Sequence, residues 1–490
     1  MTTEHADLLV VGAGPAGLAA AVTAALGGLR VTLLDAGPGL GGQYWRHPEP
    51  GAGAELRSST RRYHHDLRTY AALTDSVARL AERGAVAYRP NHQVWTAAVA
   101  TEGFVAHAVD RSVDRGDARA EPRALRYTGS RLLVATGAYD RQLPFEGWDL
   151  PGVFSAGGLQ ALLKGNGVRA GSRVVIGGTG PFLLPVAVGL AQAGAEVAAV
   201  CEASSGAGWL RQGHALAGVP GKLVEGAEYA ADLARYRIPL RPRTAIIAAR
   251  GDRRVEEVTT ARLSAQGAVV PGSQRTLVAD TVGVGWGFAP QLDLALTLGC
   301  ELTGSADGNE VVVVDAGQRT SVPGVSAAGE VCGVGGAVLA LREGQLAAEA
   351  VLADSGREPV TDAADLERVR RLVTAHRAFA TAMHTAHPLP PRWGAQVGDD
   401  VTVCRCEEVT AGAVRAAVDA GAGDARQVKQ LTRAGMGWCQ GRMCAAGVEC
   451  LVRSTRPDTR SADAPLRVAA SERLIANPVP LRALVAESDA

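Results

Sequence analysis

The stretch that decides the fold runs Asp7-Leu8-Leu9-Val10-Val11-Gly12-Ala13-Gly14-Pro15-Ala16-Gly17. Its apolar run, residues 8–11, is typical of a buried strand, and three glycines follow at G-x-G-x-x-G spacing. Gly12 suits the tight turn, Gly14 lets the backbone approach a pyrophosphate, and Gly17 allows the next helix to pack closely on the strand. The stretch therefore predicts the first turn of a dinucleotide-binding unit.

The residues that follow this stretch complete the same unit. A helical run reaches Leu26, and a second strand, Arg30 to Leu34, ends in Asp35. The helix N-terminus would face the phosphates with its partial positive charge, and Asp35 can accept a hydrogen bond from a ribose hydroxyl. The candidate cofactor-binding residues of this first unit are Gly12, Gly14, Ala16, Gly17 and Asp35.

A second strand-turn-helix-strand order begins at Arg173 and ends at an acid, Glu202. Its candidate residues for a nicotinamide cofactor are Gly178, Gly180 and Glu202. Leu183 replaces the third glycine, so the helix should lie further from its strand. Glu202 would repel a 2′-phosphate, which favours NADH over NADPH if a nicotinamide binds. A Rossmann-like domain that binds no nicotinamide stays open as the alternative.

Four cysteines stand close to the C-terminus in a C-x-C, 32-residue, C-x4-C arrangement: Cys404, Cys406, Cys439 and Cys444. In a large chain that looks intracellular, such clustering favours a metal site over disulfides. Four thiolates suit either an iron–sulfur cluster or zinc. The remaining cysteines, Cys201, Cys300, Cys332 and Cys450, are interpreted as small buried hydrophobes.

Composition sets limits on the class of protein. The chain has 490 residues, 47 % of them apolar, and a net charge of zero. It should divide into two to four domains, and its charge implies no nucleic-acid partner. The basic residues are nearly all arginine, so an arginine is weak evidence for a phosphate site. The first apolar run is too short for a signal peptide or a membrane span, so we expect a cytoplasmic protein.

Three distant pieces of sequence resemble the two-dinucleotide-binding-domain flavoproteins. They are Gly41-Gly42-Gln43, the strand end Leu132 to Gly137, and Val325 to Glu330 with the following Gly335-Gly336-Ala337. The resemblance implies that FAD occupies the first unit and adds these candidate residues: Gly42, Gln43, Thr136, Gly137, Gly329, Glu330, Gly336 and Ala337. The late acid of the family is usually Asp, and Glu330 is one methylene longer. No cysteine pair follows Gly42, so a dithiol relay beside the flavin is not expected.

The cysteine region resembles the bacterioferritin-associated-ferredoxin-like [2Fe-2S] module. Together with the flavin motifs, the whole chain is similar to the FAD-containing α subunits of heteromeric amine dehydrogenases and oxidases, the group of opine oxidase, D-hydroxyproline dehydrogenase and dye-linked proline dehydrogenase. Hydrogen cyanide synthase and multimeric sarcosine oxidase subunits are related to that group. The resemblance implies a smaller FAD-containing partner subunit that carries the amine, and leaves a small ferredoxin-like subunit open.

These observations predict an α/β protein with two Rossmann-like domains and a C-terminal [2Fe-2S] module. The expected division is 1–150 with 286–355 for FAD, 151–285 for the NAD-type domain, 356–399 for a helical linker, 400–455 for the module and 456–490 for a tail. The predicted function is an electron-relaying subunit for the oxidation of an amino or imino acid or an opine-like amine. The alternative is a self-sufficient NADH-dependent flavin reductase. No catalytic acid or base is predicted.

Overall fold

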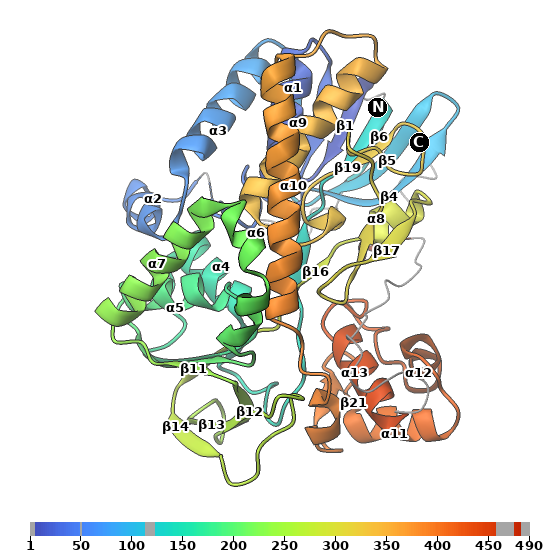
Figure 1. Ribbon diagram of the computed structural model, residues 1–490. Coiled ribbons are helices and arrows are strands. Elements are labelled where there is room, and N and C mark those ends of the chain that lie inside the picture. The colour runs from blue at the N-terminus through green and yellow to red at the C-terminus, as the bar shows by residue number, and fades with distance from the viewer. Residues whose placement is uncertain (1–4, 50, 113–122, 457–474, 482–490) are drawn as a thin grey trace.

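The computed structural model describes residues 5–49, 51–112, 123–456 and 475–481 (Figure 1). In this view, one α/β unit lies above the other. A long helix, α10 (Ala363–Ala386), runs past both of them, and a small helical module follows it. The mixed α/β fold with two parallel-sheet regions is the predicted fold class.

The first unit is built on a seven-stranded sheet in the order β3-β2-β1-β6-β5-β4, with β19 paired to β6. The central strands are parallel, and β4 and β5 are antiparallel additions at one edge. The strands are β1 (Ala6–Val11), β2 (Val31–Leu34), β3 (Val86–Arg89), β4 (His92–Ala100), β5 (Gly103–Asp110), β6 (Arg123–Val134) and β19 (Val325–Ala327). The sequence predicted a hairpin connection at residues 110–123, of which 113–122 lie outside the described residues.

Helices cover the first sheet because its strands are apolar on both faces. Helix α1 (Pro15–Leu26) packs against α9 (Ala337–Asp354) and α3 (Leu67–Glu82). The α1 side chains are almost all small, with several alanines fully buried, so the neighbouring helix approaches closely. Sequence segments more than 300 residues apart therefore share one core.

The second unit has a five-stranded parallel sheet in the order β11-β10-β9-β15-β8. Its strands are β8 (Val153–Ser155), β9 (Arg173–Gly178), β10 (Glu196–Glu202), β11 (Leu240–Pro242) and β15 (Thr281–Gly285). Helices α4 (Ala156–Asn166), α5 (Leu183–Gln192) and α7 (Pro220–Arg235) belong to it. A separate antiparallel sheet comprises β12 (Thr244–Arg250), β13 (Glu257–Arg262) and β14 (Arg275–Val278).

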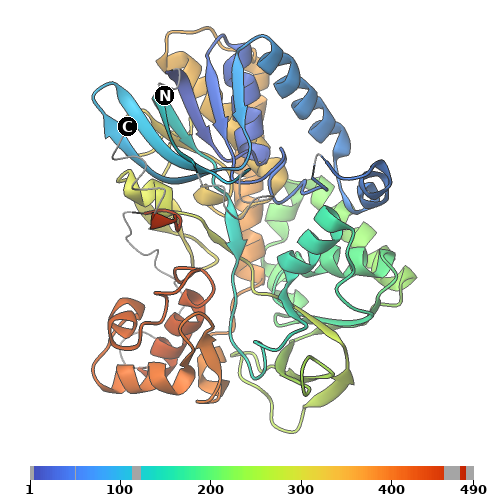
Figure 2. The same cartoon turned by 180° about the vertical axis from the view of Figure 1, so that it is seen from behind.

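The chain passes between the two units through a short two-stranded sheet. Strand β7 (Ala138–Asp140) leaves the first unit and pairs with β16 (Phe288–Pro290), which returns to it. Both connections are visible from behind in Figure 2. The sequence predicts these crossings at residues 143–153 and 283–290, because both segments are apolar and rich in Pro and Gly. Strand β16 lies within the second range, whereas β7 precedes the first.

The C-terminal module consists of three helices and a short hairpin. Helix α10 begins after its cap Asp362 and ends before the proline-rich break, as predicted. The module elements are β20 (Thr402–Cys404), β21 (Val409–Thr410), α11 (Ala411–Asp419), α12 (Ala425–Thr432) and α13 (Ala445–Thr455). Thr410 Oγ1 accepts from Ala413 N at 3.3 Å and so caps α11 as the sequence indicated.

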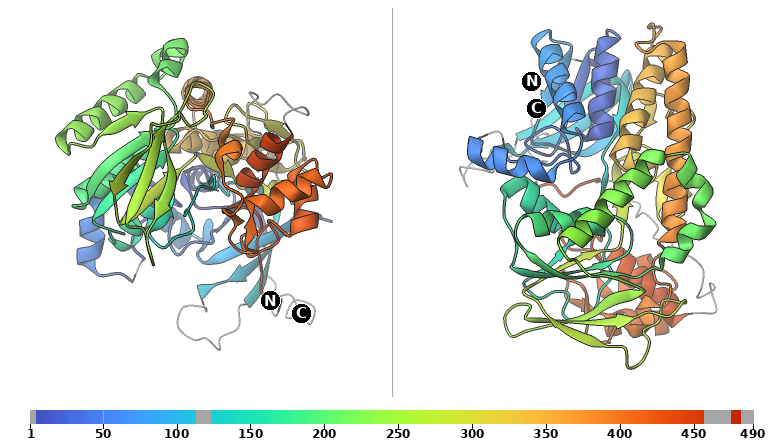
Figure 3. Two further views of the ribbon diagram at one scale, coloured as in Figure 1. Left: turned by 90° about the horizontal axis from the view of Figure 1, so that it is seen from below. Right: turned by 60° about the vertical axis from the view of Figure 1, so that its left-hand side comes forward.

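The module lies beside the β12–β14 sheet, as the view from below shows (Figure 3). Its buried residues form one continuous apolar cluster with those of the second unit. Trp393 joins the two parts, with its ring 4.9 Å from that of Trp286 and its indole nitrogen donating to Pro144 O at 2.8 Å. Within the described ranges, no helix is both long and apolar enough to cross a membrane.

Candidate cofactor sites

The glycine turn after β1 has the backbone that the sequence predicted. Gly12 has φ +108°, and a Cβ there would lie 2.2 Å from the carbonyl oxygen of Ala135. A Cβ on Gly17 would lie 1.8 Å from Gly12 O, so only glycine lets α1 pack this closely on β1. A Cβ on Gly14, in contrast, would meet nothing within 4 Å. The turn is thus closely packed against the protein at Gly12 and Gly17. It has open space at Gly14, just before α1, where a pyrophosphate could approach the backbone.

Other candidate FAD residues gather around this turn. A Cβ added to Gly42 would lie 2.8 Å from the Cα of Gly14, and one on Gly329 would lie 3.0 Å from the Cβ of Ala16. Thr136 follows the Ala135 carbonyl that faces Gly12, and its hydroxyl donates to Gln291 O at 2.8 Å. Segments from four parts of the sequence therefore meet at one end of the first sheet, at the carboxyl ends of β1 and β6.

The two acids of this site accept hydrogen bonds from backbone N–H groups of the turns beside them. Asp35 accepts from Ala13 N at 2.5 Å and from Gly37 N at 2.6 Å, and burial raises the pKa of its carboxyl. Glu330 accepts from Gly336 N at 2.9 Å, which holds the turn from which α9 begins at Ala337. Burial likewise raises the pKa of Glu330. The longer Glu330 thus reaches across its own loop to the start of α9.

Two further candidates lie beside this site. Gly137 has φ +76°, and its carbonyl accepts from Gln291 N at 2.9 Å. The Gln43 side chain accepts from the Arg46 guanidinium at 2.6 Å. Because the open Gly14 backbone is surrounded by the segments that carry the other candidates, the residues present fit an FAD.

The second unit differs from the first at the start of its helix. Helix α5 begins at Leu183, whereas α1 begins at Pro15, directly after the second glycine of its turn. Leu183 occupies the position of Gly17 and is buried against Gly285. Gly178 keeps the close contact of a Rossmann turn, since a Cβ there would lie 1.7 Å from Gly285 O. The two turns therefore differ chiefly in the side chain at this third position, while Phe182 before Leu183 already has helical backbone angles.

Glu202 is already surrounded by donors from its own unit. Its carboxylate accepts from Gly180 N at 2.9 Å, Thr179 Oγ1 at 3.0 Å and Ser204 N at 2.8 Å. His387, just after α10, lies 3.5 Å from the same carboxylate. Burial opposes ionisation of Glu202, but hydrogen bonding and charge from His387, together with Ser204, lower its pKa overall. Asp35 of the first unit accepts from Ala13 N and Gly37 N in the same way, so each acid is held by the turn beside it.

The four predicted cysteine ligands meet in two pairs. The Cys404 and Cys444 thiols are within hydrogen-bonding reach of each other, and so are those of Cys406 and Cys439. Cys404 and Cys444 are buried, whereas Cys406 is exposed and Cys439 is half-buried. Among the described residues, no three His, Cys, Asp or Glu side chains converge on one point as a single metal ion requires. The two loops thus supply four thiols, the number of ligands that a [2Fe-2S] cluster takes.

The backbone around the cysteines makes close contacts with their side chains. Gly435 N donates to Cys404 Sγ at 3.4 Å, a contact of the kind that tunes cluster potentials. A Cβ on Gly437 would lie 2.1 Å from the Cβ of Cys406, so only glycine permits the two loops to come together. Glu408 and Gln440, one in each loop, have positive φ values of 52° and 53°. The residues present therefore fit a [2Fe-2S] cluster.

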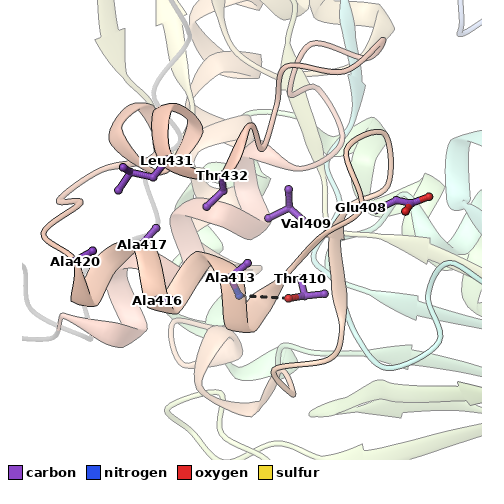
Figure 4. A pocket seen from close by; sticks show the side chains of 9 residues that line it. All are labelled: Glu408, Val409, Thr410, Ala413, Ala416, Ala417, Ala420, Leu431 and Thr432. Carbon is purple, nitrogen blue, oxygen red and sulfur yellow. Dashed lines mark hydrogen bonds between the residues drawn. The ribbon is translucent and has the colours of Figure 1, made fainter.

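A surface groove of about 470 Å³ opens between α11 and α12 (Figure 4). Alanines of α11, with Val409 and Leu431, form its apolar lining. All of its lining residues belong to the module, so it does not mark the flavin site.

Two functional contacts were missed by the sequence reasoning. His387 reaches Glu202 from 185 positions further along the chain, and no local pattern signals this contact. Arg442, inside the C-x4-C motif, forms an ion pair with Asp293 of the first unit at 3.0 Å. Because arginine is so common in this chain, Arg442 did not stand out as a candidate. Its position between two cluster ligands was the signal that could have identified it.

The fold and both sites define the class of protein: an FAD-dependent oxidoreductase that carries a [2Fe-2S] domain. Residues 6–352 match the family model "Pyridine nucleotide-disulphide oxidoreductase", and residues 402–454 match "BFD-like [2Fe-2S] binding domain". The second match confirms the cluster prediction and rules against the zinc alternative.

The chain belongs to the pyridine nucleotide-disulphide oxidoreductase family. It is 36 % identical to an opine oxidase subunit of Rhizobium meliloti (strain 1021), over 92 % of both chains. It is 32 % identical to hydrogen cyanide synthase subunit HcnB of Pseudomonas aeruginosa, over 89 % of this chain and 90 % of that one.

A solved structure, L-proline dehydrogenase from P. horikoshii, superposes with a TM-score of 0.65 over 98 % of this chain and 79 % of the other, at 19 % identity. The predicted resemblance to amine-oxidising flavoprotein subunits is confirmed by the sequence relatives. The names of both sequence relatives describe them as subunits of an enzyme.

Proposed function

We propose that this chain is the electron-relaying subunit of a heteromeric cytoplasmic dehydrogenase that oxidises an amino or imino acid or an opine-like secondary amine. A smaller FAD-containing subunit would oxidise the amine. FAD would occupy the candidate residues around Gly12 and Gly14 in a domain made of 1–150 and 286–355. A flavin can accept two electrons together, whereas a [2Fe-2S] cluster carries one at a time. The chain would therefore connect a two-electron oxidation to one-electron transfer.

The observation that carries this proposal is the asymmetry of the cysteine site. The Cys404–Cys444 side is buried within the protein, and the Cys406–Cys439 side reaches the surface. Trp438, next to Cys439, is 77 % exposed, and Met436, two residues before it, is also exposed. An exposed apolar surface beside a metal ligand is suited to a protein that exchanges electrons there. The relay requires no side chain to act as a general acid or base.

A spectrum tests the cofactors and their ligands. The purified chain should show flavin bands and a broader iron–sulfur absorption that dithionite bleaches. Cys404→Ser should lose the iron–sulfur absorption and keep the flavin. Cys450→Ser is the matched control, because Cys450 is an equally buried cysteine of α13 outside the two pairs. An unchanged spectrum in Cys404→Ser would refute the ligand assignment.

Co-expression tests the partner. The chain alone should not reduce a dye with amines as donors, and it should do so when co-expressed with a smaller FAD subunit encoded beside it. The sensitive readout is dye reduction for a panel of secondary amines and D- and L-imino acids. Amine oxidation by this chain alone, at the same rate as by the complex, would contradict the relay role.

The alternative, a self-sufficient NADH-dependent reductase, is disfavoured by the second unit. Its turn carries Leu183 where the first unit has Gly17, and this side chain is buried against Gly285. Rapid mixing with NADH should leave the flavin oxidised over the turnover time of the complex. Prompt bleaching of the flavin by NADH would instead support the reductase.

A further inference from the structure

Arg442 lies between the cluster ligands Cys439 and Cys444, and its guanidinium leaves the module. Its Nη2 group approaches three acceptors outside the module: Asp293 Oδ2 at 3.0 Å, Ala476 O at 2.5 Å and Asn477 Oδ1 at 3.4 Å. Only 16 % of the Arg442 side chain and 11 % of that of Asp293 is exposed. An ion pair so well shielded from water is a specific contact rather than a chance surface encounter.

The acceptors are themselves fixed to the first unit. Asp293 begins α8 (Asp293–Thr297), and Ala476 and Asn477 belong to the described C-terminal segment, residues 475–481. Ala476 N donates to Trp95 O at 2.7 Å, and Asn477 Nδ2 donates to Val94 O at 2.8 Å, so this segment is attached to β4. Ala476 is buried in the apolar cluster of the first sheet.

The same acceptors connect to the candidate flavin residues. Gln291 Nε2 donates to Asn477 Oδ1 at 3.3 Å. The backbone of Gln291 makes two hydrogen bonds with candidate flavin residues. Its carbonyl accepts from Thr136 Oγ1 at 2.8 Å, and its N–H donates to Gly137 O at 2.9 Å. A chain of hydrogen-bonded residues therefore connects Arg442, in the loop of Cys439, to Thr136 after β6 by way of Asn477 and Gln291.

We propose that Arg442 is a positioning residue for electron transfer. It ties the loop that carries Cys439 and Cys444 to the flavin-binding unit through Asp293 and the 475–481 segment, and so fixes the separation of the two cofactors. The inference rests on the proposed relay function. In the step concerned, one electron passes between them: the flavin is oxidised by one electron and one iron of the cluster is reduced.

The module has another attachment, which explains why the contact of Arg442 is not needed merely for folding. Trp148 Nε1 donates to Thr402 O at 2.5 Å, and the Arg405 guanidinium lies 5.0 Å from the centre of the Trp148 ring. Trp148 lies beyond β7, where residues 143–148 already pack in the apolar core of the second sheet, so these contacts and that shared core hold the module on the second unit. The contact of Arg442 is a separate link from the module to the first unit.

The experiment compares Arg442→Gln with the wild-type holoprotein. A flash-generated deazaflavin radical reduces the protein, and the first-order phase that does not depend on protein concentration reports transfer between flavin and cluster. We expect Arg442→Gln to retain both cofactors and to slow this phase severalfold, because the rate of electron transfer falls exponentially as the separation of donor and acceptor grows. Arg442→Lys should recover part of the rate because one ammonium can still reach Asp293.

A second readout is independent of electron flow. Hydrogen–deuterium exchange of residues 475–478 and 439–443 should rise in Arg442→Gln and stay unchanged in Arg433→Gln. Arg433 is the matched control because its ion pair with Glu407, at 2.9 Å, stays within the module. Wild-type rate and exchange in Arg442→Gln would overturn the inference.

A third variant keeps the test decisive if Arg442→Gln binds no cluster. Asn477→Ala removes one acceptor of Arg442 and the contact with Gln291 at a site more than 30 positions from any ligand cysteine. It should slow the transfer phase in the same direction with full cofactor content, and an unchanged rate would overturn the inference. If the wild-type protein shows no intramolecular phase, the relay function itself fails, which is a distinguishable result.

Discussion

At the scale of single residues, glycines that look alike in the sequence have different roles. Gly12 and Gly17 are required by the protein's own packing, because a Cβ at either would lie about 2 Å from a backbone oxygen. Gly14 has a negative φ of −72° and free space around it. The packing of the protein therefore gives no reason for glycine at position 14, and an FAD pyrophosphate at this turn would supply one.

Gly14→Ala should consequently separate folding from cofactor binding. The apoprotein should melt at the wild-type temperature, while its affinity for FAD should fall by roughly tenfold or more, about 1.4 kcal/mol, because the new methyl group takes the space of the pyrophosphate. Fluorescence titration of apoprotein with FAD measures the affinity. Gly226→Ala, at an open position on α7, is the control and should bind FAD normally. Normal binding by Gly14→Ala would place the pyrophosphate elsewhere.

Lys164 is a buried amine with few partners. It is 5 % exposed, and its ammonium donates to Tyr44 O at 3.3 Å across the boundary between the two units. Burial lowers the pKa of Lys164 to about 8, whereas an unfolded lysine titrates near 10.4. Between these two values the unfolded chain binds the additional proton, so stability should rise as pH rises from about 8 to about 10.

Lys164→Met should abolish this rise. The wild-type protein should gain up to roughly 3 kcal/mol relative to the variant across that pH range, with the variant the more stable protein at pH 7. Urea unfolding at a series of pH values measures the free energy of unfolding of both proteins. Subtracting one from the other removes the contributions of the groups that the two proteins share. Parallel curves would mean that Lys164 keeps its normal affinity for a proton in the fold.

At the scale of elements, α10 does more than link domains. Arg377 of α10 donates to Gly333 O at 2.6 Å and forms an ion pair with Glu343 of α9. Glu343 is 1 % exposed and accepts from Gly329 N at 2.9 Å. Burial raises the pKa of Glu343 to about 7, although Arg377 acts to lower it. Helix α10 therefore supports the loop that contains the late acid Glu330.

Arg377→Met should leave the Glu343 carboxyl buried without its partner. The expected cost is about 3–5 kcal/mol, seen as a lower temperature of FAD release in a fluorescence melt. The double variant with Glu343→Gln should recover part of that loss, since the unpaired charge is then gone. Arg371→Met, at an exposed position of the same helix, is the control. Equal melts for Arg377→Met and Arg371→Met would show that the pair does not hold the loop.

Sequence reasoning succeeded where one element carries the whole signal. The turn after β1, the cap Thr410 and the cysteine spacing are local patterns, and each predicted its element and role from neighbouring residues. It failed for contacts between distant elements. Arg442 meets Asp293 across 149 positions, and His387 meets Ser204 across 183. Neither pairing has a periodicity or motif, because only the packed arrangement of units brings these side chains together.

At the scale of the whole molecule, the cluster module is part of the protein's core rather than an appendage. Its apolar residues are continuous with those of the second unit, and Trp393 is 1 % exposed at their junction. The flavin unit is held by different contacts, among them those of Arg442 and α10. The sequence indicated a linker and a separate module, but not that the module would complete a neighbouring core.

Trp393→Ala should therefore weaken two parts of the molecule at once. Loss of its ring from the contact with Trp286 should cost about 3–5 kcal/mol. Because the core is shared, bleaching of the cluster and loss of near-ultraviolet dichroism from the second unit should move to lower temperature together. Trp438→Ala is the control, since that ring is largely exposed and its loss should leave both transitions in place. If Trp393→Ala lost its cluster early while the dichroism of the second unit stayed at the wild-type temperature, the module would be an independent domain, and the fixed spacing of the cofactors would have to rest on Arg442 alone.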